Sequence, residues 1–130
     1  MTRLDHAAGA DILERYGRAW ETFDGDAWTD LFTADVEYHE DPFESPLIGS
    51  NAVRAYLLAA AERQDQVEFT TERHWVNETA VLAIWHASYV RRTDRARVRL
   101  AGFLTMEIRD DGRIARFREW FHRRESSSSG

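Results

Sequence analysis

The sequence predicts an α+β fold in which three N-terminal helices pack on one face of a curved, mostly antiparallel sheet. Two observations lead to this prediction. Apolar residues recur at helical spacing in the first half of the chain, and long β-rich segments follow one another after residue 65. Helices followed by a run of strands are typical of α+β domains. With 130 residues, 43% of them hydrophobic, the chain can form one domain with its own core.

The expected helices lie at residues 7–23, 27–32 and 51–64, where apolar side chains share one helical face. Asp26 is expected to cap the second helix and Ser50 the third. Both residue types stand just before a helical segment, and their side chains accept hydrogen bonds from the backbone N–H groups of a first turn.

One strand is expected before a loop that contains two prolines, and four longer strands are expected to follow the third helix. Their ranges are 34–41, 67–76, 80–92, 97–109 and 113–124. The pair Asp111-Gly112 between two alternating segments is a strong hairpin signal. We expect a single domain over residues 1–125 and a disordered tail over 126–130, because SSSSG is of low complexity.

Composition excludes several classes of function. The net charge of −6 argues against a general affinity for nucleic acid or anionic membranes. The chain has no Cys, which excludes disulfides, thiolate metal sites and a Cys nucleophile, and it has no Lys, which excludes Schiff-base chemistry. Its first residues are charged and lack the apolar segment of a signal peptide, so a cytoplasmic location is expected.

Three segments are similar to the nuclear transport factor 2-like superfamily, which includes ketosteroid isomerases and SnoaL-like polyketide cyclases. They are ERYGRAWETFDGD at 14–26, EDPFESPLIGSNAVRAYL at 40–57 and DDGRIARFREWF at 110–121. The resemblance covers about residues 8–123. It implies a cone-shaped α+β barrel and chemistry without a cofactor. It also implies a homodimer, which members of the superfamily often form through the sheet face.

The resemblance also implies roles for individual residues. Asp41, before a Pro-Phe turn, matches the general base of the ketosteroid isomerases, and Tyr16 matches the Tyr that donates a hydrogen bond to the oxyanion. The second oxyanion donor of those enzymes, a protonated Asp, falls on Leu104, so that acid is missing. Glu119 is a counterpart of the acid/base carboxylate of the SnoaL-like cyclases.

Alternation along a strand sends every second side chain to the same face of a sheet. If Asp41 faces the pocket, Glu37 and His39 face it as well, while Tyr38 and Glu40 face away. His39 is therefore a candidate to assist Asp41 in proton transfer.

The same rule assigns the other pocket walls. The residues expected to face inward are Leu82, Ile84, His86, Ser88, Val98, Leu100, Gly102, Leu104, Met106, Phe117, Glu119 and Phe121. Val81, Trp85, Tyr89, Phe103 and Trp120 would then form an outward aromatic patch too large to expose, which a sheet-face homodimer would cover.

Each candidate also has a structural explanation. Asp41 can bond backbone N–H groups in an Asp-Pro turn, Tyr16 can be an ordinary helix residue, and His39 and His86 can be structural. Glu119, between two Phe, needs a partner if it is buried. Arg73, Arg99 and Arg118 are the candidate partners. No HxH or HExxH spacing supports a metal site, so no metal and no cofactor is expected.

Two functions from different classes remain open. The first is a cofactor-independent isomerase, cyclase or lyase that acts on a hydrophobic carbonyl compound. Its base is Asp41 and its oxyanion donor is Tyr16, with His39, His86 or Glu119 assisting. The second is a non-catalytic protein that uses the same hydrophobic pocket to bind an apolar small molecule.

Overall fold

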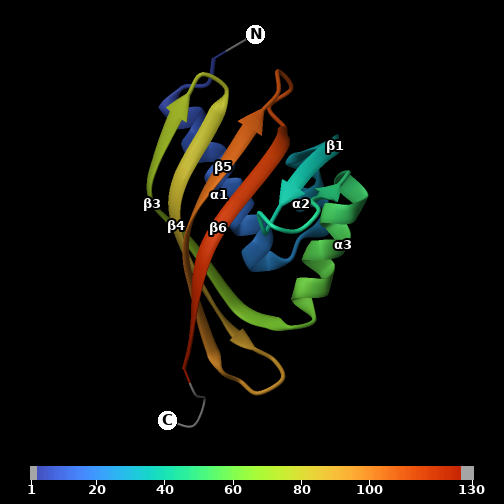
Figure 1. Ribbon diagram of the computed structural model, residues 1–130, viewed down its shortest axis with the longest axis vertical. Coiled ribbons are helices and arrows are strands. Elements are labelled where there is room, and N and C mark those ends of the chain that lie inside the picture. The colour runs from blue at the N-terminus through green and yellow to red at the C-terminus, as the bar shows by residue number, and fades with distance from the viewer. Residues whose placement is uncertain (1–2, 127–130) are drawn as a thin grey trace.

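The computed structural model describes residues 3–126 and has three helices on a six-stranded sheet (Figure 1). The elements in chain order are α1 (His6–Thr22), α2 (Gly25–Asp30), β1 (Phe32–His39), β2 (Leu47–Ile48), α3 (Ser50–Ala61), β3 (Gln64–Asn77), β4 (Ala80–Arg91), β5 (Arg97–Ile108) and β6 (Ile114–Ser126). Strand β6 includes the first residue of the predicted tail, and residues 127–130 lie outside the described residues. None of the described helices is long and apolar enough to cross a membrane.

The strands follow the order β2-β1-β6-β5-β4-β3 across the sheet. Neighbours pair antiparallel except β1 and β6, which run parallel, so the first strand lies beside the last. The sheet curves around the helices without closing into a barrel (Figure 1), because β2 and β3 at its two edges do not pair with each other. The predicted fold class is confirmed.

Helix α1 packs directly on β3, and two glycines make the close approach possible. A Cβ at Gly9 would lie 2.7 Å from Cγ2 of Val76, and one at Gly17 would lie 2.5 Å from Cδ1 of Phe69. Both distances are shorter than real carbon contacts, so only glycine fits at these positions. Helix α1 therefore closes one side of the space above the sheet.

The helix caps differ in part from the prediction. Asp24, rather than Asp26, caps α2 by accepting a hydrogen bond from the Ala27 N–H at 3.1 Å. Gly49, rather than Ser50, is the N-cap of α3, and it makes no side-chain cap bond. Its φ of 94° lies in the region that glycine adopts without strain. The sharp turn of the chain from β2 into α3 therefore favours glycine at this position.

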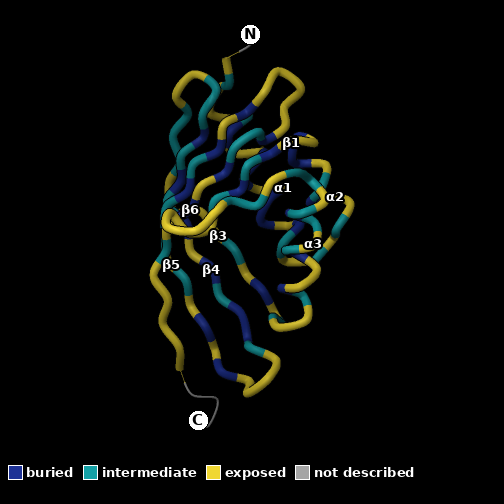
Figure 2. The backbone as a smooth tube through the Cα atoms, turned by 45° about the vertical axis from the view of Figure 1, so that its right-hand side comes forward, coloured by how far each residue is buried: buried dark blue, intermediate teal, exposed yellow. Residues whose placement is uncertain are grey.

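The core lies between the helices and the inner face of the sheet, and it is rich in aromatic rings. Buried and exposed positions alternate along the strands (Figure 2). Tyr38 stacks on Phe117 with ring centroids 4.4 Å apart, and both are almost completely buried. Because β1 and β6 are paired at these two residues, the stack joins the two strands that are most distant in sequence.

The predicted inner face is confirmed for β5 and β6 and wrong for β4. Leu104, Met106 and Phe117 are fully buried, as expected. On β4 the buried residues are Val81, Ala83, Trp85, Ala87, Tyr89 and Val90, and all but Val90 share one face by alternation. The partly or largely exposed ones are Leu82, Ile84, His86 and Ser88.

The assignment on β4 failed because both of its faces carry apolar side chains, so alternation alone could not distinguish them. The pairing of β4 with β5 fixes which of the two faces points inward. Trp85 is paired with Gly102 of β5, and its indole ring is buried on the inner face with 1% of its surface exposed.

The predicted faces of β1 are also reversed. Val36 and Tyr38 point into the core, whereas Glu37 and His39 share the outer face with Arg116 and Arg118 of β6. Glu37 contacts Arg116, and the hydrogen bond from this guanidinium lowers the pKa of Glu37. The apolar residues Val36 and Tyr38 carried the correct signal, since the larger apolar burial fixes the face of the strand.

Candidate functional site

A cavity of about 170 Å³ lies between the helices and the inner face of the sheet. Its lining residues come from every layer of the fold. They are Tyr16, Trp20, Trp28, Tyr38, Glu40, Tyr56, Leu57, Ala60, Arg63, Gln64, Trp85, Tyr89, Leu100, Glu119, Phe121 and Arg123. Most of these side chains are aromatic or apolar, and a few are polar, which is the usual composition of a small-molecule site.

Glu119 is the buried carboxyl group of this cavity, and only 7% of its surface is exposed. Burial raises its pKa from 4.5 to about 8, and the Glu40 carboxylate contributes to the same shift. No hydrogen bond or ion pair to another side chain is found for Glu119 within residues 3–126. The expected pairing with Arg73, Arg99 or Arg118 is therefore not present. A carboxyl group in these surroundings is largely protonated at neutral pH and can donate a hydrogen bond.

Three tyrosines surround the same space. The hydroxyl oxygens of Tyr16 and Tyr38 are 3.5 Å apart. Burial raises the pKa values of Tyr16, Tyr38 and Tyr56, and the carboxyl of Glu119 adds to each shift. All three hydroxyl groups therefore stay protonated and can donate hydrogen bonds at physiological pH.

More polar residues form the rim of the cavity. Glu40 is exposed and interacts with the Tyr56 hydroxyl, which contributes to the raised pKa of Tyr56. Gln64 accepts a hydrogen bond from the Trp20 indole N–H at 2.9 Å. Arg63 and Arg123 are the two guanidinium groups among the described residues that line the cavity.

Tyr16, Leu100, Glu119 and Phe121, which the sequence predicted for the site, do line this cavity. Leu104, Met106 and Phe117 lie in the surrounding hydrophobic core. Leu82, Ile84 and His86 are on the opposite face, as part of the corrected register of β4.

Asp41 and His39 do not line the cavity. Asp41 is exposed, and its Oδ1 accepts a hydrogen bond from the Phe43 N–H at 2.9 Å, as an Asp in an Asp-Pro turn often does. His39 lies on the outer side of β1, where its Nε2 is 3.4 Å from Oε1 of Glu37. The strand ends at His39, so the carboxylate that continues its inner face is that of Glu40.

Sequence reasoning missed several residues of the cavity, mainly Tyr38, Glu40, Tyr56, Trp85 and Arg123. For Tyr38 and Glu40 a usable signal existed, because both follow Val36 at a spacing of two. Arg123 had none. Alternation with Glu119 and Phe121 suggests an inner position, but an Arg near a strand end is usually solvated.

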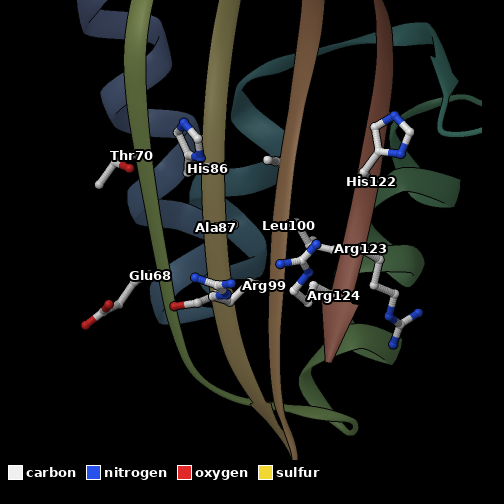
Figure 3. Close-up of a pocket in the computed structure, with 11 residues that line it drawn as sticks. Glu68, Thr70, His86, Ala87, Arg99, Leu100, His122, Arg123 and Arg124 are labelled. Atoms are coloured by element: carbon white, nitrogen blue, oxygen red, sulfur yellow. The ribbon is translucent and has the colours of Figure 1, made fainter. Parts of the chain in front are cut away.

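A second hollow of about 730 Å³ lies on the outer face of the sheet, away from the helices (Figure 3). Its side chains include His86, Arg99, His122 and Arg124, which project from adjacent strands, and it shares Leu100 and Arg123 with the inner cavity. His86 is half-exposed, and its Nε2 lies 3.0 Å from Oε1 of Glu72. This hollow is open to solvent, and every ionisable residue among its described lining residues is exposed. Within residues 3–126, no group of three or more His, Cys, Asp or Glu residues could hold a metal ion.

The curved α+β sheet and its internal, mostly aromatic cavity define a class of small-molecule pocket proteins. The SnoaL-like domain model matches residues 13–117, and the chain belongs to this family within the nuclear transport factor 2-like superfamily. No curated protein matches the sequence significantly.

Solved structures of known proteins share the fold at low sequence identity. An LEH-like epoxide hydrolase of Mycobacterium tuberculosis is 22% identical, with a TM-score of 0.76 over 89% of this chain and 84% of that one. SalBIII, an epoxide hydrolase/cyclase-like enzyme of pyran ring formation in salinomycin, is 19% identical, with a TM-score of 0.80 over 91% and 93%. The Δ5-3-ketosteroid isomerase of a Mycobacterium species is 15% identical, with a TM-score of 0.78 over 92% and 98%. At these identities the likeness concerns the fold.

Proposed function

We propose that the protein is a cofactor-independent enzyme that moves protons on a small, mostly apolar carbonyl compound, as in an isomerisation through an enol. The observation that supports this most is the buried carboxyl group of Glu119, which has a pKa of about 8 and lines a cavity without a hydrogen-bond partner among the described residues. Such a group is costly to bury, so it is expected to serve a function there.

In this proposal Glu119 donates a hydrogen bond to the substrate oxygen, together with the hydroxyl of Tyr16 or Tyr38. Donors in a site without bulk water stabilise the negative charge that develops on this oxygen as an enolate forms. The resemblance to ketosteroid isomerases placed a protonated acid at Leu104. Leu104 and Glu119 are direct Cα partners across β5 and β6, so the neighbouring strand presents the acid at the same level of the pocket.

The general base is Glu40 rather than Asp41 in this proposal. Glu40 lines the cavity and is exposed to water at its rim, whereas Asp41 is held in the adjacent turn. Two carboxyl groups in different environments can take different roles. The buried Glu119 is the hydrogen-bond donor, and the solvated Glu40 is the base. Glu40 takes the proton from the carbon next to the carbonyl group, and the electron pair of the C–H bond becomes part of the enolate.

The size of the cavity limits the substrate. A volume of about 170 Å³ is close to that of an engineered cavity of about 150 Å³ that binds benzene. A monocyclic compound therefore fits, whereas a four-ring steroid is too large for this shape of the pocket. The aromatic walls favour an apolar ring.

The test is the isomerisation of 3-cyclohexenone to its conjugated isomer, followed by ultraviolet absorbance. Glu40→Gln is expected to lower kcat/KM by about 10²- to 10⁴-fold, the usual contribution of general acid–base catalysis. Glu119→Leu, which removes the hydrogen-bond donor, is expected to lower it by about 10²- to 10³-fold. Asp41→Asn is the matched control and should keep the wild-type rate. A rate that falls with Asp41→Asn but not with Glu40→Gln would refute the assignment of the base.

The state of Glu119 can be measured without a substrate. NMR titration of protein with ¹³C-labelled Glu, assigned through Glu119→Gln, is expected to give a pKa of about 8 for this carboxyl. A pKa near 4.5 would refute the proposal. A pKa of about 8 together with binding but no turnover of small ketones would indicate the non-catalytic binding protein instead.

We also propose a homodimer through the outer face of the sheet. The patch predicted from the sequence is corrected, because Val81, Trp85 and Tyr89 are buried inside. An apolar outer patch nevertheless exists and consists of Trp75, Leu82, Ile84, Phe103 and Trp120. Trp120 is 42% exposed, and a second copy would cover it in an isologous contact.

Light scattering tests the dimer. The wild type is expected to be dimeric at micromolar concentration, and Trp120→Arg is expected to be monomeric with an unchanged circular dichroism spectrum. A monomeric wild type would contradict this proposal. A cytoplasmic location stays a prediction, which fractionation of the producing cells would check.

A further inference from the structure

We infer that the cavity selects a small compound with a carboxylate at one end, which Arg63 and Arg123 bind while the reacting oxygen lies beside Glu119. This inference rests on the proposed function, because it names the class of substrate for the same site. It adds a second point of recognition that none of the proposed catalytic steps requires.

The cavity has two different polar ends. Glu119 and Arg123 both line it from strand β6 and stand four residues apart. Since a strand advances about 3.3 Å per residue, their Cα atoms are about 13 Å apart. Glu40 belongs to the Glu119 end, because the two carboxyl groups interact electrostatically. Among the described lining residues, the Arg123 end contains no carboxyl group.

Between these ends the wall is apolar. Phe121 lies midway between Glu119 and Arg123 on the same strand, and its ring centroid is 6.0 Å from that of Trp85. Leu100 stands directly opposite Arg123 across the β5–β6 pair. An apolar ring or short chain fits this middle section, with one functional group at each end.

Both guanidinium groups can bind an anion. Arg63 is exposed and forms no ion pair within residues 3–126. Arg123 donates to the Tyr89 hydroxyl at 3.3 Å, which directs it to the cavity, and it lies 3.3 Å from Oε1 of Glu125. Glu125 is also paired with Arg91, which in turn pairs with Asp94, so these four side chains form one connected cluster of ion pairs, and Arg63 adds a further positive charge at the cavity.

The chemistry of the pair fits a carboxylate. A guanidinium presents several N–H donors in one plane and binds carboxylates through two parallel hydrogen bonds. Although the chain has a net charge of −6, two arginines line this cavity together with Glu40 and Glu119. The protonated state of Glu119 also removes the repulsion that an anionic substrate would otherwise meet inside the cavity.

The experiment compares two probes of the same size, cyclohexanecarboxylate and cyclohexanecarboxamide, at neutral pH and low salt. Both are transparent where tryptophan fluoresces, and three tryptophans line the cavity, so quenching reports binding. The wild type is expected to bind the carboxylate about tenfold more tightly than the carboxamide, as one charged bidentate contact allows. Arg63→Gln and Arg123→Gln should each weaken carboxylate binding about five- to tenfold and change carboxamide binding less than about twofold.

Arg99→Gln is the matched control, because Arg99 is an exposed arginine of the outer hollow. It should leave the affinity for both probes unchanged. Equal affinity of the wild type for the two probes would overturn the inference, and so would the absence of carboxylate binding at millimolar concentration. An equal loss in Arg99→Gln would also overturn it, since the effect would then come from overall charge.

The two proposals fail separately. The Glu119 titration is measured on the ligand-free protein and tests only the acid. If Glu119 titrates near pH 8 while both probes bind equally, the inference about the carboxylate is wrong and the proposed function stands. If Glu119 titrates near 4.5 while the arginine variants behave as expected, the proposed acid is wrong and the carboxylate site stands.

Discussion

The two faces of the sheet both carry ionisable side chains around a hollow, but in different surroundings. The outer hollow is the larger, with about 730 Å³ against about 170 Å³ for the inner cavity. Its His86 is half-exposed and paired with Glu72, so water and a partner satisfy it. Inside, Glu119 is buried and has no side-chain partner within residues 3–126, and burial raises its pKa to about 8. The comparison teaches that desolvation, and not the size of a hollow or its number of polar groups, changes the chemistry of a side chain.

The strongest way to test this contrast is the pH dependence of stability in Glu119→Gln. The pKa of Glu119 is about 8 in the folded protein against 4.5 for an ordinary Glu, so folding favours its protonated form. Its contribution to stability is complete below pH 4.5 and is lost as the pH rises to about 8. The total loss of unfolding free energy over this pH range is roughly 5 kcal/mol, from about 1.36 kcal/mol per pKa unit.

Urea unfolding at several pH values measures this effect. The difference in unfolding free energy between wild type and Glu119→Gln should shift by several kcal/mol in favour of the variant from pH 5 to pH 8. Arg99→Gln on the outer face should differ from wild type by less than about 0.5 kcal/mol at each pH. A difference between wild type and Glu119→Gln that does not change with pH would contradict the desolvation argument.

A second prediction compares one tryptophan from each face. Trp85 is 1% exposed and contacts Phe69 and Phe121, whereas Trp120 is 42% exposed. Trp85→Ala should lower the unfolding free energy by about 3–5 kcal/mol, because it removes a large buried ring and leaves a cavity. Trp120→Ala should lower it by less than about 1 kcal/mol.

Both variants are measured by urea unfolding at concentrations at which light scattering shows monomers, so that any dimer does not contribute. Similar losses for the two variants would mean that the outer patch is as well packed as the inner face, and the contrast between the faces would fail.

A smaller loss of stability is expected for a substitution at the contact between α1 and β3. A Cβ at Gly17 would lie 2.5 Å from Cδ1 of Phe69, and a phenyl ring cannot yield as a flexible chain end would. Gly17→Ala should therefore destabilise the protein by about 1–3 kcal/mol, although Ala favours helix formation. Thermal unfolding measures it, and Ala10→Gly on the same helix is a control for helix propensity alone. A stabilised Gly17→Ala protein would show that α1 and β3 are not in tight contact.

Much of the fold could be predicted from local patterns. The helices, the five long strands and the hairpin at Asp111-Gly112 follow from hydrophobic period and turn chemistry, which act over a few residues. The inner faces of β5 and β6 were correct because one face of each is clearly apolar around Leu104 and Phe117. The two-residue strand β2 was missed, since Leu47–Ile48 is too short to show a period.

The candidate site was predicted only in part. Tyr16 and Glu119 were recognised, but the carboxylate of the first strand was assigned to Asp41 instead of Glu40 as the group that faces the cavity. These two residues are adjacent, and a shift of one residue reverses the face of every side chain in a strand. The position of Glu40 depends on the pairing of β1 with β6, and this pairing joins residues almost eighty positions apart.

The sequence by itself determined the α+β class, the order of the elements and the presence of a carboxyl group among the aromatic residues of the last strand. These properties depend on interactions between residues that are near in the chain. Only the tertiary structure decided which faces of β1 and β4 point inward, that Glu119 has no partner among the described residues, and that Arg63 and Arg123 line the same cavity. The physical reason is that burial and electrostatic environment are set by neighbours from distant segments, and a pKa responds to those neighbours rather than to the residue's position in the sequence.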